Sequence, residues 1–172
     1  MRISTLLMFL VILCACSARP EQNGTEDSIL RISGTDLLYE IPFPATSIVA
    51  EPDQLGTSLA MCVVDTLHEI SALLFSLPNK PENQQEVEEV VRLISHQNTP
   101  GFTCTATDKI KECNYIGTSA WSFESIILLR NSQDSIKVLF NGRIFENKAF
   151  VVTANCTDSI NFDPYIYGLK RI

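Results

Sequence analysis

Hydrophobic residues recur at helical spacing in two segments of the first half of the chain. Between Thr57 and Phe75 the apolar positions return every three or four residues, which predicts an amphipathic helix; they are Leu59, Val63, Leu67, Ile70 and Leu74. A second helix is predicted over about Glu82–Gln97, where acidic residues fill the first half and Arg92 and His96 lie near the end, as the helix dipole favours. Asn79, with Glu82 three residues later, approximates a capping box before it.

After Phe102 the hydrophobic period changes to two, which is typical of half-buried strands. A strand is predicted over Trp121–Arg130, and another begins at Ile136. Asn141-Gly142 is the strongest short hairpin signal in the chain, because a type I′ turn needs positive φ at both central residues. The next strand should therefore run back from Ile144, and Ala149–Ala154 should continue it.

This order of elements predicts an α+β fold, with two N-terminal helices packed on an antiparallel β-meander. Residues 29–172 should form one domain, since a chain of this length can bury a single core. A short strand is expected at Leu37–Ile41. Residues 17–28 are polar and predict a flexible tether.

The first sixteen residues have the pattern of an export signal. Arg2 precedes the apolar run Leu6–Leu13, which small residues follow. The run is too short to cross a bilayer, which takes roughly 20 apolar residues. Residues 1–16 therefore place the protein outside the cytoplasm, and we expect them to be absent from the fold.

Two processing routes fit the end of this signal. Leu13-Cys14-Ala15-Cys16 resembles the lipobox of bacterial lipoproteins, which implies lipidation at Cys16 and anchoring in the cell envelope. Alternatively, cleavage at a small-x-small site around Ser17 would release a freely secreted protein. Asn23 and Asn155 both lie in N-x-[ST] sequons, so a secreted glycoprotein that contacts a host or partner protein is the second interpretation.

Charge narrows the range of partners. The net charge is −7, which argues against nucleic acid, since phosphate binding needs clustered Lys and Arg. The same acidity argues against binding to anionic lipid head groups, and leaves an N-terminal lipid anchor as the expected membrane contact. The remaining partner classes are a protein or a small ligand.

Four cysteines follow the signal, and an even number in an exported chain predicts two disulfides; they are Cys62, Cys104, Cys113 and Cys156. If a hairpin turned at Asp108-Lys109, Cys104 would lie opposite Cys113, within disulfide range. Cys62 would then bond Cys156 by elimination.

No combination of residues identifies a reaction. Asp65, His68 and Glu69 would share one face of the predicted helix and could serve a hydrolase-like enzyme, but a solvated helix face explains them as well. His68-Glu69 lacks the second His of a zinc protease motif, and no metal or cofactor is expected. Trp121 and Phe123 could present a ligand-facing aromatic surface on the sheet, but they are interpreted as core residues. The sequence therefore favours a non-enzymatic binding or structural module.

Overall fold

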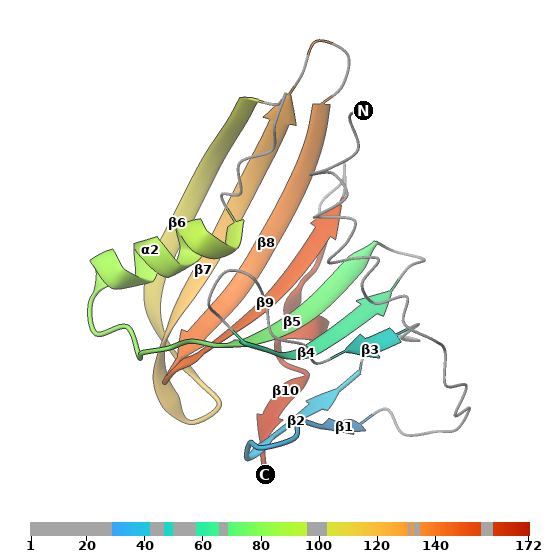
Figure 1. Cartoon of the computed structure of the whole chain (residues 1–172), viewed down its shortest axis with the longest axis vertical. Helices are drawn as coiled ribbons and strands as arrows, with labels where there is room; N and C mark the ends of the chain where they lie inside the picture. The colour runs from blue at the N-terminus through green and yellow to red at the C-terminus, as the bar shows by residue number, and fades with distance from the viewer. Residues whose placement is uncertain are drawn as a thin grey trace.

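The computed structural model describes residues 29–41, 47–49, 58–65, 69–95, 103–130, 132, 135–155 and 160–172. These residues form ten strands in two antiparallel sheets, with two short helices (Figure 1). The fold is therefore mainly β, and the predicted α+β arrangement of two helices on a meander is wrong.

The larger sheet has seven strands in the order β3-β4-β5-β9-β8-β7-β6. Their bounds are β3 Ser47–Val49, β4 Ser58–Asp65, β5 Ile70–Ser76, β6 Thr103–Tyr115, β7 Thr118–Arg130, β8 Ser135–Phe145 and β9 Lys148–Asn155. The last four follow one another as a meander, and β9 then pairs with β5. The predicted antiparallel meander is thus present as half of this sheet.

The smaller sheet and the longer of the two helices cover the larger sheet from opposite sides. Strands β1 (Ile29–Arg31), β2 (Leu37–Glu40) and β10 (Leu169–Arg171) form the smaller sheet, and α3 (Asp163–Ile166) lies close to it. Their apolar side chains bury one face of the larger sheet around Phe150 and Leu74. Helix α2 (Gln84–Ser95) buries part of the other face through Val87 and Val91, and lies across the long strands (Figure 1).

The helix predicted over 57–75 is replaced by the β4–β5 hairpin. Residues 70–75 are all buried, because β5 has a hydrophobic core on each side. A strand that is buried on both faces loses its alternation of apolar and polar residues, so apolar positions also match a helical period. The chain reverses just before β5, where Glu69 has a φ of 54°.

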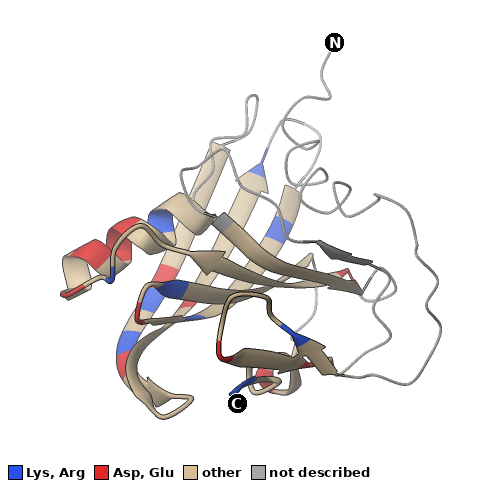
Figure 2. Cartoon of the chain, turned by 60° about the horizontal axis from the view of Figure 1, so that its bottom comes forward, with Lys and Arg blue, Asp and Glu red and all other residues tan. Residues whose placement is uncertain are grey.

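The second predicted helix is confirmed as α2, although its N-terminal cap lies four residues later than expected. The Asn83 Oδ1 accepts a hydrogen bond from the Glu86 N–H at 3.1 Å, and the Glu86 carboxylate accepts one from the Glu82 N–H at 2.8 Å. Glutamates dominate the exposed side of α2 (Figure 2). Its one-sided burial explains why the helical period was informative here.

The predicted hairpin turn at Asn141-Gly142 is wrong, because both residues lie inside β8. The chain turns instead at Ile116-Gly117 and at Glu146-Asn147. Gly142 has a packing role: a Cβ atom there would lie 2.2 Å from the buried Phe123 ring and 3.0 Å from the Phe150 carbonyl oxygen. The glycine therefore makes room for Phe123 on the neighbouring strand.

The predicted disulfides are not supported. Asp108-Lys109 lies within the continuous strand β6, so Cys104 and Cys113 are nine residues apart on one strand, or about 30 Å. Cys62 is buried on β4 rather than on a helix, and Cys156 lies outside the described residues. Among the cysteines that the structure describes, no pair is at disulfide distance.

Two buried tyrosines lie in the core between the sheets. The Tyr115 hydroxyl donates to the Ile166 carbonyl oxygen at 2.5 Å and ties β6 to α3. The Tyr39 hydroxyl is buried without a hydrogen-bond partner among the described residues. Burial raises the pKa of both tyrosines well above the ordinary value of about 10.

Replacing Gly142 by Ala should lower the free energy of unfolding by about 1–3 kcal/mol, because the added methyl group overpacks the Phe123 site. Urea denaturation measures this loss. Phe123→Leu shortens the clashing ring, so the double variant should be more stable than the sum of the two single effects predicts. Strict additivity would show that the ring is not what excludes a side chain at position 142.

Stability should fall as the pH rises above about 10. There the unfolded chain loses the protons of Tyr39 and Tyr115, while the folded chain keeps them, since folding raises both pKa values. Tyr39→Phe should cost little at neutral pH and should reduce the alkaline slope by up to about 1.4 kcal/mol per pH unit. Tyr167→Phe is the control, since Tyr167 is 61% exposed. An unchanged slope in Tyr39→Phe would show that the raised pKa of Tyr39 does not contribute to the loss of stability at alkaline pH.

Candidate ligand pocket

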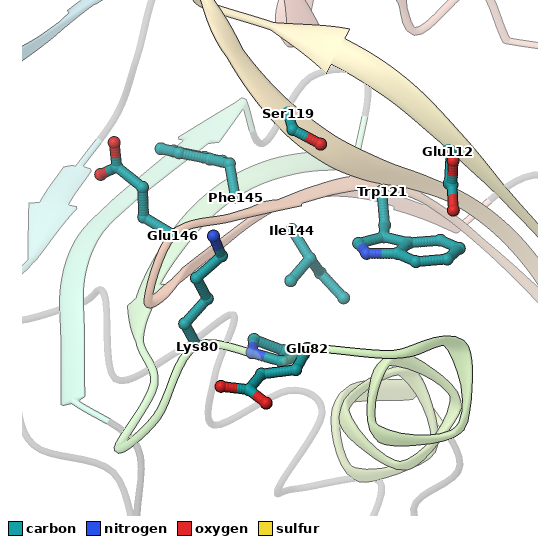
Figure 3. Close-up of a pocket in the computed structure, with 9 residues that line it drawn as sticks. Lys80, Glu82, Glu112, Ser119, Trp121, Ile144, Phe145 and Glu146 are labelled. Atoms are coloured by element: carbon teal, nitrogen blue, oxygen red, sulfur yellow. The ribbon is translucent and has the colours of Figure 1, made fainter.

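A pocket of about 320 Å³ opens where the segment before α2 crosses the larger sheet (Figure 3). Its lining residues come from that segment, from β6 and β7, and from the end of β8; they are Lys80, Pro81, Glu82, Glu112, Ser119, Trp121, Ile144, Phe145 and Glu146. Ligand pockets in proteins run from about 300 Å³ upward, so this one suits a small molecule.

The sheet side of the pocket is a row of cross-strand neighbours. Glu112 on β6 pairs with Trp121 on β7, and Trp121 pairs with Ile144 on β8. Directly paired residues project from the same face of a sheet, which here is the α2 side. The half-buried indole and the buried Ile144 thus form an apolar floor, and the exposed Glu112 carboxylate lies at its edge.

The opposite wall is held in place at several points. The Leu77 N–H donates to the Asn147 carbonyl oxygen at 2.7 Å, which fixes the start of the segment to the β8–β9 turn. Pro81 is buried, and the cap at Asn83 fixes the end. Lys80 and Glu82 therefore project from a restrained backbone. The Lys80 side chain extends toward Ile144, whereas the Glu82 carboxylate points away from Trp121 (Figure 3).

The pocket carries more negative than positive charge. The carboxylates of Glu82 and Glu112 make no ion pair with any described residue, and Lys80 supplies the one ammonium group of the lining. Glu146 is already engaged: one oxygen lies 2.6 Å from the Arg171 guanidinium and the other 3.7 Å from the Lys148 ammonium. Two carboxylates of the lining thus make no ion pair with a described residue, and that of Glu112 belongs to the cross-strand neighbour of the indole.

Arg171 connects this rim to the smaller sheet. Its guanidinium also lies 2.9 Å from the Asp36 carboxylate, so the last strand bridges β2 and the β8–β9 turn. The hydrogen bond with Glu146 raises the pKa of Arg171 above its usual value. The bridge keeps Glu146 oriented toward Arg171 at the rim.

The arrangement suits binding better than bond cleavage. Ser119 is the hydroxyl that lines the pocket, and within the described residues it has no hydrogen bond to an acid or a base that could activate it. An indole beside unpaired carboxylates instead attracts cations, through the ring quadrupole and through charge.

The structure does not form the helix face predicted for Asp65, His68 and Glu69. Asp65 ends β4 and pairs with Ile70, Glu69 is exposed in the turn, and His68 lies outside the described residues. The helical neighbourhood on which the hydrolase hypothesis depended is therefore absent. Among the described residues, no three His, Cys, Asp or Glu side chains gather as a metal site.

The other predicted sites fall mostly outside the described residues, which do not include Cys16 or Asn23. Asn155 is half-buried at the end of β9, where its N–H donates to the Glu69 carbonyl oxygen at 3.3 Å. Phe123 is a core residue, as expected. Trp121 packs against the same core but also lines the pocket, so the alternative of a ligand-facing aromatic residue describes its position as well.

Comparison with protein families and with characterised proteins finds no match to the chain. The class that the structure defines is a two-sheet antiparallel β domain with a small acidic pocket beside one helix. In the described part of the chain, no helix has the length and apolar character of a membrane span.

The cap at Asn83 can be tested against the position that the sequence suggested. Asn83→Ala should lower the free energy of unfolding by about 1 kcal/mol, since the Glu86 N–H loses its acceptor. Asn79→Ala is the control, because Asn79 is exposed and precedes the cap. Urea denaturation compares the two, and equal losses would contradict the observed cap.

Proposed function

We propose that this protein is an exported, non-enzymatic binding module that captures a small organic cation in the pocket beside α2. The observation that carries the proposal is the row Glu112–Trp121–Ile144, which combines an aromatic face, an aliphatic floor and a carboxylate without an ion-pair partner among the described residues. Glu82 adds a second such carboxylate from the opposite wall.

The chemistry of these groups favours a cation with an apolar body. The methyl or methylene groups of such a ligand would contact Trp121 and Ile144, and its positive charge would lie near the indole and the Glu112 carboxylate, with the Glu82 carboxylate contributing from farther away. Cation–π contacts contribute about 0.5–2 kcal/mol, more when water is excluded. Anionic ligands would be repelled, since Lys80 is the one cation of the lining.

The exported location rests on residues 1–16, which have the pattern of a secretion signal. Anchoring through Cys16 and free secretion are both compatible with a ligand-capturing role. Export and lipidation remain predictions from the sequence. The intact mass of the mature protein distinguishes a form lipidated at Cys16 from a freely secreted one.

Trp121 is the single tryptophan of the chain, so its fluorescence reports on the pocket directly. Choline should change this emission saturably. Its uncharged isostere 3,3-dimethyl-1-butanol should bind about tenfold more weakly, because it lacks the charge that the indole and carboxylates attract.

Charge-neutral variants separate the pocket from the rest of the acidic surface. Glu112→Gln and Glu82→Gln should each weaken choline binding several-fold, whereas Glu88→Gln, on exposed α2 outside the pocket, should not. No saturable change in emission, or equal affinity for choline and its isostere, would overturn the proposal.

A further inference from the structure

The face of β6, β7 and β8 that points away from α2 has a net positive charge, although the chain as a whole is acidic. We call this the outer face. Its charged members are Lys109 and Lys111 on β6, Glu124 and Arg130 on β7, and Lys137 and Arg143 on β8. Five cations thus share a surface with one carboxylate, in a chain whose net charge is −7.

The alternation of side chains along a strand produces this separation. In Asp108-Lys109-Ile110-Lys111-Glu112 the acids and the lysines fall on opposite faces of β6. The Ser125 hydroxyl donates to Asp108, and Glu112 lines the pocket, so both acids lie on the α2 side. The glutamates of α2 add to that side, and Figure 2 shows acidic bands on the helix and basic bands along the long strands.

The cations of the outer face are not neutralised by their neighbours. Lys109, Lys111, Arg130 and Lys137 form no ion pair with any described residue, although Lys109 is the cross-strand neighbour of Glu124. Arg143 is held 5.9 Å from the Tyr115 ring centroid and donates to Asn141 and Gly142. Its charge therefore stays on this face.

A partly exposed aliphatic strip lies between two groups of these cations. Ile126 is 38% exposed and pairs with Thr107 on one side and Leu139 on the other; Leu128 follows two residues later. Lys109, Lys111 and Arg143 lie beyond one end of this strip, and Arg130 and Lys137 lie at or beyond the other.

We propose that the outer face docks on the surface of an anionic lipid bilayer. The cations spread over three strands rather than along one line, which matches a planar array of head groups better than an extended polyanion. Ile126 and Leu128 would meet the apolar boundary of the head-group layer, while the basic side chains contact lipid phosphates and carboxylates. Each such Lys or Arg contributes about fivefold in affinity near an anionic membrane.

Screening decides whether the acidic remainder of the chain prevents this contact. At physiological ionic strength the Debye length is about 8 Å, while a helix packed on a sheet places its own exposed side chains farther than that from the opposite face. The membrane would therefore sense the outer face and little of α2. At 0.01 M salt the Debye length is about 30 Å, and the net charge would repel the whole chain.

The test is co-sedimentation of the full chain with vesicles that contain about one-third phosphatidylserine, compared with pure phosphatidylcholine vesicles. Neutral vesicles measure the contribution of the apolar run Leu6–Leu13, which is identical in every variant. Binding to anionic vesicles should exceed binding to neutral ones. It should also be strongest near 0.15 M salt, and weaker at both 0.01 M and 1 M.

Charge reversal locates the contact. Lys109→Glu/Lys111→Glu should weaken the anionic-specific partitioning by about 30-fold or more. The matched control Arg31→Glu/Arg92→Glu makes the same change in net charge at two exposed arginines that are not part of the outer face, one on β1 of the smaller sheet and one on α2, and should have a small effect. Ile126→Thr should weaken binding several-fold, while Leu93→Gln, at an exposed leucine of α2, should not.

Circular dichroism confirms that each variant is folded before its partitioning is compared. Equal losses in the two charge-reversal pairs would overturn the proposal, as would equal binding to anionic and neutral vesicles. Retention on a sulfated polysaccharide without vesicle binding would overturn the bilayer assignment as well. Binding that rises steadily down to 0.01 M salt would contradict the inference that the acidic remainder of the chain opposes membrane contact when it is not screened.

Discussion

The structure depends on burial of the central strands of the larger sheet from both sides. Residues 70–75 of β5 and 149–152 of β9 are buried throughout, and they contribute to both hydrophobic cores. A strand in this position needs an apolar side chain on each face, and the smaller sheet and α2 contribute to the cores on the two sides. Loss of either cover would expose a continuous apolar surface, which couples the two halves of the fold.

Other elements bury less of the larger sheet toward β6 than at its centre. The candidate sites lie where the buried part of the sheet gives way to the exposed part. On the α2 side, the segment before the helix crosses the end of β7 and β8 and leaves the pocket beside Trp121. On the opposite side, β6 and β7 extend beyond the smaller sheet and present exposed lysines and Ile126. Both proposed binding surfaces therefore arise where long strands continue past the core.

Sequence periodicity was informative only where burial is one-sided. Helix α2 has one exposed face, and its helical pattern predicted it. The β4–β5 hairpin has two buried faces, so its apolar residues matched a helix by coincidence. Asn141-Gly142 suggested a turn because glycine suits positive φ, but Gly142 instead accommodates the Phe123 ring, a contact between strands that no local pattern records.

The wrong expectation of a turn within β6 is also the reason why neither the pocket nor the charge of the outer face was predicted. The observed turn at Ile116-Gly117 makes Glu112 and Trp121 direct neighbours, a pairing that the sequence did not predict. The same shift converts Asp108, Lys109, Lys111 and Glu112 from a mixed turn into a strand that sorts acids and bases onto opposite faces. Net charge cannot reveal such sorting, because it sums over both faces. Since screening limits electrostatic contact to about one Debye length, the charge of one face, rather than the sum over the chain, is the quantity from which the binding of that face is argued.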